Sequence, residues 1–275
     1  MKMKTAVFTD KMILVRGGGD LATGVIHKLH QSGYQILILE CDRPSAIRRH
    51  VAFCEAVYDG TAEVEGVVCR RVTEDDIRTQ CRKCWAKGEI PLLTDTDGKH
   101  IRELEPEAVI DAILAKKNLG TRISDAPLVI GIGPGFTAAG DCHFVIETQR
   151  GEHLGEVICE GSAIPNTGIP GNIGGYTVER LLKASADGIM HPVARIGDVV
   201  KKGQIVARCG DEPVYARLHG IVRGMLQEGV PVKKGLKIGD VDARIEEKLC
   251  YTISDKARKI GNGVAEAIDL VYKTK

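Results

Sequence analysis

The chain has 275 residues, which is enough for two or three compact units. Lys and Arg (38) almost balance Asp and Glu (37), and only 4% of residues are aromatic, so the composition does not favour nucleic acid or an anionic membrane as the main partner. No apolar run reaches the length of a secretion signal or a membrane span, so we expect a cytoplasmic protein. The nine cysteines are odd in number and scattered, which disfavours a disulfide framework.

The first part of the chain, residues 1–123, alternates short apolar runs with helical stretches. MILV, QILIL and IPLLTD suit buried parallel strands, whereas DLATGVIHKLHQSG and EDDIRTQCRKCWAKG suit helices. This alternation predicts an α/β fold whose first domain is a Rossmann-like open parallel sheet.

Residues 124–186 are expected to form a second glycine-loop and β-hairpin region. APLVIGIGPGF is typical of a strand that runs into a glycine loop, and the sequence around Arg150 and Gly151 predicts a hairpin turn. Residues 162–175 carry no charge and are dense in Gly, Pro and Asn, so they predict a long loop. The segment that follows, YTVERLLKA, predicts a helix.

Residues 187–245 contain an internal repeat, because residues 188–207 align with residues 220–239 when shifted by 32 positions. Both copies contain V-K-K-G, and the half-motif resembles the barrel-sandwich halves of lipoyl and biotinyl carrier domains. The link between the halves has no lysine, so we expect a structural or docking β-module and not a swinging-arm carrier. Residues 246–275 predict a C-terminal helix with Ser254 as its N-cap.

The motif RGGGDLATG lies between a predicted strand and a predicted helix. Gly17, Gly19 and Ala22 fit GxGxx(G/A), in which glycines let backbone N–H groups approach a phosphate. Glu40 ends the second predicted strand, where a carboxylate would accept hydrogen bonds from ribose hydroxyls. Asp20 fits less well, because a carboxylate at a helix start repels phosphate. We favour nucleotide or pterin-phosphate binding over the alternative, a purely structural turn.

Two further uncharged loops are expected to line the same pocket. The loop GIGPGF follows a predicted strand, and residues 162–175 supply neutral hydrogen-bonding groups. The candidate positions in these loops are Gly131, Gly133, Gly135, Asn166 and Thr167.

The thiols offer two candidates. Cys81 and Cys84 have CxxC spacing inside a charged helical stretch, but no second ligand pair accompanies them, so we predict incidental helix positions and no metal site. Cys142 follows the second glycine loop and precedes His143. It is the candidate catalytic residue, as a thiolate that attacks or carries a chalcogen; a buried small side chain is an equally open alternative.

LVRGGGDLATGVIHKL, APLVIGIGPGF, GSAIPNTGIPGNIGGY and ISDKARKIGNGV together resemble the YqeB family, accessory proteins named for selenium-dependent molybdenum hydroxylase systems. The resemblance covers essentially the whole chain and implies a role in maturing hydroxylases of the xanthine dehydrogenase type, with a Rossmann-like region similar to that of XdhC proteins. The motif positions that it marks include Gly17, Gly19, Asp20, Gly24, Gly131, Gly133, Gly135, Asn166, Thr167 and Gly171.

Three hypotheses follow. The first is a maturation factor that binds a molybdopterin-type cofactor and assists insertion of labile selenium, with a molybdenum hydroxylase and a selenium-donor protein as partners. The second is an NAD(P)-dependent oxidoreductase that uses the first glycine loop and Glu40. The third is a non-catalytic scaffold whose β-module docks a partner.

Overall fold

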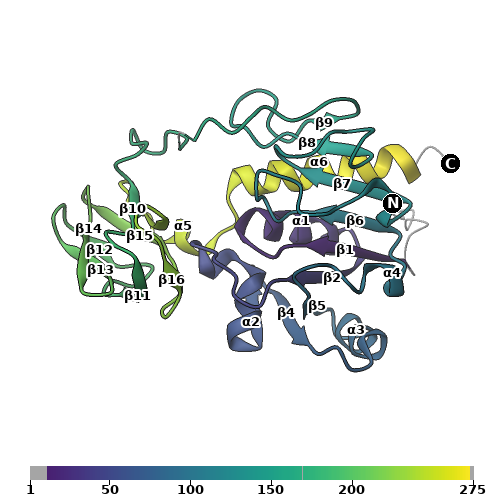
Figure 1. Cartoon of the computed structure of the whole chain (residues 1–275), viewed down its shortest axis with the longest axis horizontal. Coiled ribbons are helices and arrows are strands. Elements are labelled where there is room, and N and C mark those ends of the chain that lie inside the picture. Colours follow the sequence, from purple (N-terminus) through teal and green to yellow (C-terminus); the bar gives the residue numbers. More distant parts are fainter. Residues whose placement is uncertain (1–10, 169, 273–275) are drawn as a thin grey trace, which may run out of the picture.

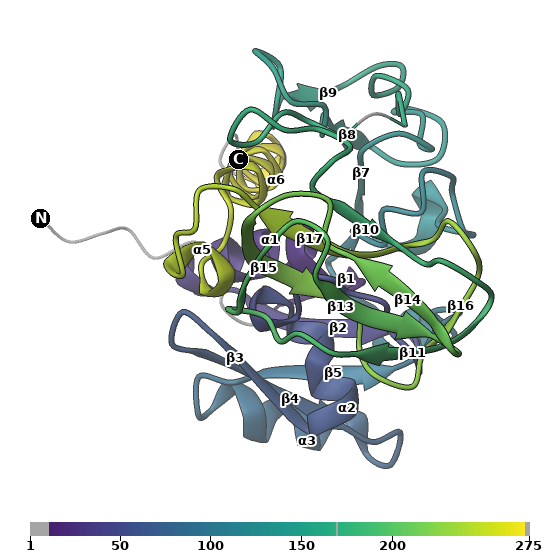
Figure 2. The ribbon, with the colours of Figure 1, turned by 90° about the vertical axis from the view of Figure 1, so that its left-hand side faces the viewer.

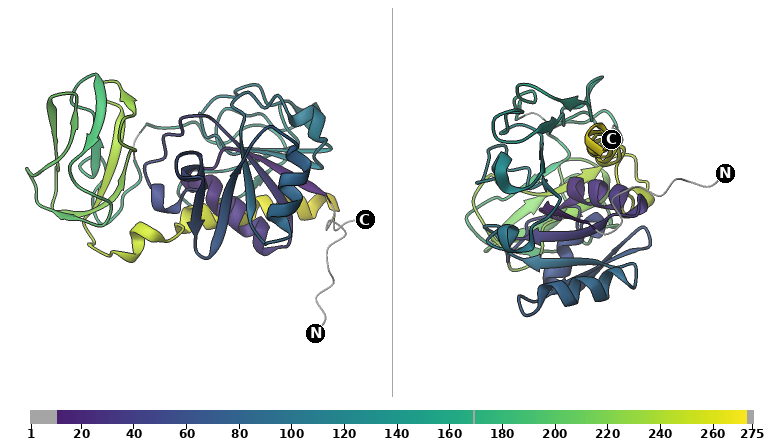
Figure 3. Two further views of the ribbon diagram at one scale, coloured as in Figure 1. Left: turned by 90° about the horizontal axis from the view of Figure 1, so that it is seen from below. Right: turned by 90° about the vertical axis from the view of Figure 1, so that its right-hand side faces the viewer.

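The computed structural model describes residues 11–168 and 170–272, and it divides into two parts (Figure 1). A sheet domain is built from the first nine strands, and a β-module from the eight strands that follow. The last helix returns from the β-module to the sheet domain, so the chain passes between the two parts twice (Figures 1 and 3). Among the residues described, no helix combines the length and apolar character that crossing a membrane requires.

The sheet domain contains one nine-stranded, mostly parallel sheet. Its strands are β1 (Met12–Arg16), β2 (Gln35–Glu40), β3 (Thr61–Val64), β4 (Val67–Val72), β5 (Ile90–Thr94), β6 (Ala108–Asp111), β7 (Leu128–Ile132), β8 (Phe144–Ile146) and β9 (Val157–Ile158). Their order is β3-β4-β5-β2-β1-β6-β7-β8-β9, and only the edge strands β3 and β9 pair antiparallel. The order reverses at β1, because β2 pairs with one side of β1 and β6 with the other.

Both faces of this sheet are buried. The helices and helical turns are α1 (Asp20–Gln31), η1 (Arg49–Val51), η2 (Phe53–Glu55), α2 (Ala56–Asp59), α3 (Ile77–Trp85), α4 (Ile101–Leu104), η3 (Ile123–Asp125), α5 (Lys248–Tyr251) and α6 (Asp255–Tyr272). Ile13 and Val15 of β1 pack with α1 and α6, whereas Leu14 packs with α3 and α4 on the other face. This alternation suits strands buried on both sides, and it confirms the predicted α/β class.

The two longest helices, α1 and α6, cross at small residues (Figure 2). A Cβ atom at Gly24 would lie 2.6 Å from the Cβ of Ala257, and one at Gly261 would lie 2.7 Å from the carbonyl oxygen of Gly24. Ser254 caps α6 as predicted, because its Oγ accepts a hydrogen bond of 3.2 Å from the N–H of Ala257. The beginning of α6 is therefore fixed against the sheet domain.

The β-module consists of two four-stranded antiparallel sheets. Its strands are β10 (Leu181–Lys183), β11 (Gly188–Pro192), β12 (Val199–Val200), β13 (Ile205–Cys209), β14 (Glu212–Tyr215), β15 (Gly220–Met225), β16 (Pro231–Val232) and β17 (Lys237–Asp242). One sheet has the order β10-β17-β15-β12, and the other has the order β14-β13-β11-β16. One hydrophobic core is shared between the two sheets.

The two copies of the repeat pair with each other. Gly188 of β11 lies opposite Val232 of β16, and Gly220 of β15 lies opposite Val200 of β12. The two pairs are related by the 32-residue shift seen in the sequence, so each copy supplies a strand to the sheet of the other. A repeat of this kind buries a face that neither copy can bury alone.

The helix predicted from YTVERLLKA is wrong, because Leu181–Lys183 form strand β10. This strand pairs with β17, and Leu182 is buried in the core of the β-module opposite Gly239. The local sequence pattern is compatible with a helix or a strand, and pairing with a strand distant in sequence selects the strand. Consequently, no helix N-terminus follows the 162–175 loop, and the anion donors expected there are missing.

We predict that Gly24→Val lowers the free energy of unfolding by about 1–3 kcal/mol, because the new side chain collides with the backbone of Ala257. Gly and Val differ by only a few tenths of a kcal/mol in helix propensity, so the change reports on packing. Urea unfolding measures it. Asn262→Val, at an exposed position of α6, is the matched control and should change stability by less than about 0.5 kcal/mol.

Candidate functional site

A pocket of about 360 Å³ lies at the carboxyl edge of the parallel sheet. Its lining residues follow the ends of β1, β6, β7 and β8, and they are completed by residues 164–167, by Gly171 and by the first turn of α6. In open α/β sheets, ligands bind at this edge, beside the point where the strand order reverses. We refer to it as the carboxyl-edge pocket.

Three cationic side chains line this pocket, and its described lining includes no carboxylate. Lys116 follows β6, Arg150 follows β8, and Lys256 lies in the first turn of α6. Burial lowers the pKa of Lys256 below its ordinary value of 10.5, and the nearby charge of Arg150 lowers it further. Asp20 and Glu147, which are outside the lining, act in the opposite direction and offset part of this charge. The lining itself is cationic, which favours an anion as the ligand.

The remaining lining is apolar or neutral. The apolar residues are Leu21, Leu114, Ile132, Pro134, Ile164 and Pro165, and the neutral polar side chains are Thr148, Gln149, Asn166 and Thr167. A largely apolar wall with a few placed polar groups is typical of sites for small organic ligands. Together with the three cations, this lining suits a small ring compound that carries a phosphate.

A buried carboxylate holds two walls of the pocket together. Glu147 is only 3% exposed, and its Oε1 accepts hydrogen bonds from the N–H groups of Thr148 (2.6 Å) and Gln149 (2.7 Å). Its Oε2 accepts a hydrogen bond of 2.8 Å from the N–H of Ile164. Glu147 therefore joins the turn after β8 to the 162–175 loop.

A second buried network fixes the loop that carries Lys116. The hydroxyl of Thr121 donates a hydrogen bond of 2.6 Å to Asp111 at the end of β6. Arg16, at the end of β1, donates one of 2.5 Å to the Thr121 hydroxyl and lies 3.4 Å from Asp111. All three side chains are buried, so both ends of the loop are anchored to the strands beneath the pocket.

The first glycine loop adjoins this pocket, but its first two backbone donors are used inside the protein. The N–H of Gly17 donates to the carbonyl of Leu39 (2.7 Å), and the N–H of Gly18 donates to Oε2 of Glu40 (2.7 Å). Gly17, Gly18 and Gly19 are not among the lining residues, whereas Leu21, just beyond them, is. Gly17 and Gly18 allow close packing of the loop, because a Cβ at these positions would lie 2.9 Å from the carbonyl oxygen of Ala112 and 3.0 Å from the backbone nitrogen of Cys54. A Cβ at Gly19 would meet no atom within 4 Å.

Three other predicted positions also have partners within the protein. The second carboxylate oxygen of Glu40 accepts a hydrogen bond of 2.8 Å from the N–H of Cys41. Asp20 forms an ion pair of 2.9 Å with Arg48, and Gly24 serves the helix crossing with α6. Each of these three residues therefore makes a contact that stabilises the fold.

The second and third loops do form the pocket. Asn166, Thr167 and Gly171 line it, as does Pro134 of the second glycine loop. Gly133 has φ +80°, and a Cβ there would lie 2.8 Å from Oγ1 of Thr148, so its glycine lets the loop approach the wall. The other two predicted glycines of this loop make equally close approaches, to Phe136 for Gly131 and to Lys117 for Gly135.

Cys142 lies outside the lining of the pocket and is fully buried. Its Sγ donates to the carbonyl of Thr137 at 3.8 Å, and burial raises the pKa of the thiol to about 11. A buried, protonated thiol favours the small-side-chain interpretation. Cys81 and Cys84 are also buried, on α3, and the described residues include no group of three His, Cys, Asp or Glu side chains that could hold a metal ion.

Sequence reasoning did not single out the three cations of the pocket. Arg150 stands in a predicted hairpin turn, and a basic residue after the carboxyl end of a strand is a usable signal. Lys116 follows β6, a strand that is not predicted from the sequence. Lys256 gives no such signal, because the whole β-module separates it in sequence from the sheet on which it packs.

The fold and the pocket define an α/β protein with a mostly parallel sheet, a cationic ligand pocket and an antiparallel β-module. No protein-family model matches the chain. Over 258 residues the chain is 47% identical to the uncharacterized protein YqeB of Escherichia coli (strain K12), and the match covers 94% of this chain and 47% of that protein. The chain thus spans about half the length of this curated relative, and the similarity supports the YqeB family over the shared part.

Solved structures offer only distant likenesses. An aspartoacylase family protein from Mesorhizobium loti matches with a TM-score of 0.26 and 10% identity, covering 84% of both chains. The ectoine utilization protein EutE from Ruegeria pomeroyi matches with a TM-score of 0.24 and 10% identity, covering 85% of this chain and 86% of that chain. Values this low carry no argument about fold or function.

We predict that Glu147→Gln destabilises the protein by about 1–3 kcal/mol, since an amide has one acceptor oxygen for three buried N–H donors. The amide of Ile164 should exchange with solvent much faster in the variant, and hydrogen–deuterium exchange measures this directly. Glu156→Gln, which alters an exposed pair with His153, is the control. Unchanged exchange at Ile164 would show that Glu147 does not hold the loop.

Proposed function

We propose that the chain is an accessory protein for selenium-dependent molybdenum hydroxylases, which binds a molybdopterin-type cofactor or a nucleotide-like ligand in the carboxyl-edge pocket. In this proposal the protein assists insertion of labile selenium, with the hydroxylase and a selenium-donor protein as cytoplasmic partners. The sheet domain is the Rossmann-like ligand-binding part, and the β-module is a barrel-sandwich unit of lipoyl type. The convergence of Lys116, Arg150 and Lys256 on one partly apolar pocket carries the proposal.

The residues of the pocket fit a ring compound with a phosphate. Lys116, Arg150 and Lys256 would hold the phosphate, and the apolar side chains would cover the ring. The amide of Asn166 and the hydroxyl of Thr167 can donate to and accept from the edge of a heteroaromatic ring. When bound, a molybdopterin-type cofactor would supply the molybdenum centre at which selenium is exchanged.

The role of the chain in this proposal is to bind and protect its ligand, because the pocket lining contains no thiol. The partners would therefore carry the selenium. The nicotinamide alternative has less support, since it relies on Glu40 for the ribose, and both oxygens of that carboxylate already accept backbone hydrogen bonds. The scaffold alternative does not explain why three cationic side chains line one pocket.

Native mass spectrometry of the anaerobically purified protein, offered molybdenum cofactor and NAD(H) together, tests the proposal. We expect retention of a molybdopterin or nucleotide mass, and Lys256→Met should weaken that binding by about 10- to 100-fold through loss of a charge-assisted contact. Lys201→Met, at an exposed turn of the β-module, is the matched control and should bind normally. Equal retention by the Lys256→Met protein would place the ligand elsewhere.

Binding of an anion should take up protons. Burial lowers the pKa of Lys256 in the free protein, and a bound phosphate raises it again. Between the lowered pKa and 10.5, more protein therefore carries the proton when ligand is bound. Calorimetric titration of AMP at an alkaline pH inside this window, in two buffers of different ionisation enthalpy, measures this uptake, which Lys256→Met should abolish. Equal heats in both buffers at that pH for the unaltered protein would contradict the prediction.

A further inference from the structure

A second cavity, of about 300 Å³, adjoins the carboxyl-edge pocket and is lined by residues of the sheet domain, of the β-module and of the segment that leads into α6. Arg150 lines both cavities. The chain neighbours Gly171 and Asn172 are divided between them, as are Lys256 and Asp255. We refer to the second cavity as the junction pocket. It continues the first along the beginning of α6.

The junction pocket receives two cations from the β-module and its C-terminal extension, Arg223 of β15 and Arg244 after β17. Asp242 is nearly fully buried and is held by Arg244 through two short contacts, from Nε to Oδ1 at 2.9 Å and from Nη2 to Oδ2 at 2.6 Å. Asp242 and Arg244 therefore largely compensate each other, and Asp255 adds a carboxylate to the lining. The three arginines of the lining, Arg150, Arg223 and Arg244, still outnumber these two carboxylates.

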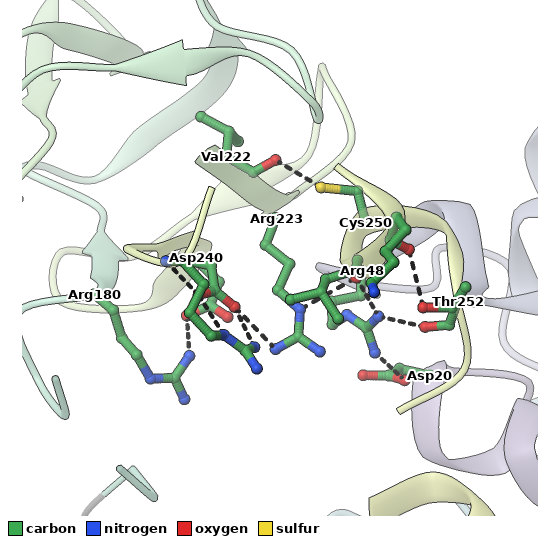
Figure 4. A network of polar contacts seen from close by, with 12 residues as sticks. Asp20, Arg48, Arg180, Val222, Arg223, Asp240, Cys250 and Thr252 are labelled. Atoms are coloured by element: carbon green, nitrogen blue, oxygen red, sulfur yellow. Dashed lines mark hydrogen bonds and ion pairs between the residues drawn. The ribbon is translucent and has the colours of Figure 1, made fainter. Parts of the chain in front are cut away.

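Arg223, which lies near Arg48 and Asp240 in Figure 4, makes longer contacts than Arg244 does. It is only 6% exposed, its Nε donates to the carbonyl of Leu249 at 3.3 Å, and its Nη1 lies 3.9 Å from Asp242. Burial lowers its pKa, and the charge of Arg48 lowers it further. Asp240, Asp242 and Asp20 act in the opposite direction and offset part of its charge. A buried guanidinium whose contacts to its neighbours are long can still donate hydrogen bonds to an anion.

We infer that the ligand carries two separate anionic groups of the phosphate class, one held in the carboxyl-edge pocket and the second held by Arg223 and Arg244 in the junction pocket. This inference rests on the proposed function, since it extends the ligand of the first pocket. Arg150 lies between the two groups and contacts both. Each pocket is about the size that encloses a small ligand, so the two together suit a larger molecule than a mononucleotide.

The inference gives the β-module a direct part in binding. The first anionic group contacts residues of the sheet domain and α6, whereas the second contacts residues from β15 and the segment after β17. A ligand with both groups therefore bridges the two parts of the chain, and a ligand with only the first does not.

Calorimetric titration of the full chain with AMP and with adenosine 3′,5′-bisphosphate tests the inference, because the probes share one ring and differ in the number of phosphates. We expect the bisphosphate to bind at least about tenfold more tightly than AMP. Arg223→Met and Arg244→Met should each remove most of that advantage and leave the affinity for AMP unchanged. Arg208→Met, on the exposed side of β13, is the matched control.

The AMP titration also shows whether each variant keeps a folded first pocket. If AMP binds and the bisphosphate binds no better, or if the advantage survives in both variants, the second site is wrong while the proposed function stands. If neither probe binds to the unaltered protein, the first anion site is absent, and both proposals fall.

Discussion

The return of α6 to α1 is the contact on which the rest of the architecture depends. Gly24 and Ala257 bring the two helices so close that a larger residue at either position would separate them. This crossing places the first turn of α6 at the carboxyl edge of the sheet, and with it Lys256. It also fixes the segment that follows the β-module against the sheet domain. The packing of α6 on α1 thus determines both the lining of the pocket and the point at which the chain returns from the β-module.

Asp20 illustrates how this arrangement changes the meaning of a sequence motif. A carboxylate at the start of α1 is unfavourable for phosphate, and its partner Arg48 explains its presence. Arg48 also donates to the carbonyls of Leu249 (2.9 Å) in α5 and Thr252 (2.8 Å) just after it, both in the segment that leads into α6 (Figure 4). The first glycine loop therefore supports the junction between the two parts. The carboxyl-edge pocket lies next to it, with its cations Lys116 and Arg150 beyond the ends of β6 and β8.

The sequence predicts the sheet well, because strands such as QILIL alternate β-branched and Leu side chains between two buried faces. The repeat is equally readable, since its pairing partners keep the spacing of 32 residues. Local patterns fail where a distant partner decides, as at Leu182, whose strand pairs with β17. The same holds for the pocket. Asn166 and Thr167 could be predicted because they lie in an uncharged loop rich in Gly, Pro and Asn, whereas Lys256 reaches the pocket only through the packing of α6 on the sheet domain.

Lys256 shows how binding and stability oppose each other at this site. Its pKa is lower in the folded than in the unfolded chain, so between the two values the unfolded chain binds more protons and stability rises with pH. At neutral pH the folded protein keeps this charge beside Arg150 at a cost that an apolar side chain would not carry. An anion between the two removes that cost, so a ligand should stabilise the fold beyond its new contacts. The cluster of Lys116, Arg150 and Lys256 lowers the stability of the protein when no anion is bound, so it does not serve the fold. This cost is the physical argument for the anion site that we propose.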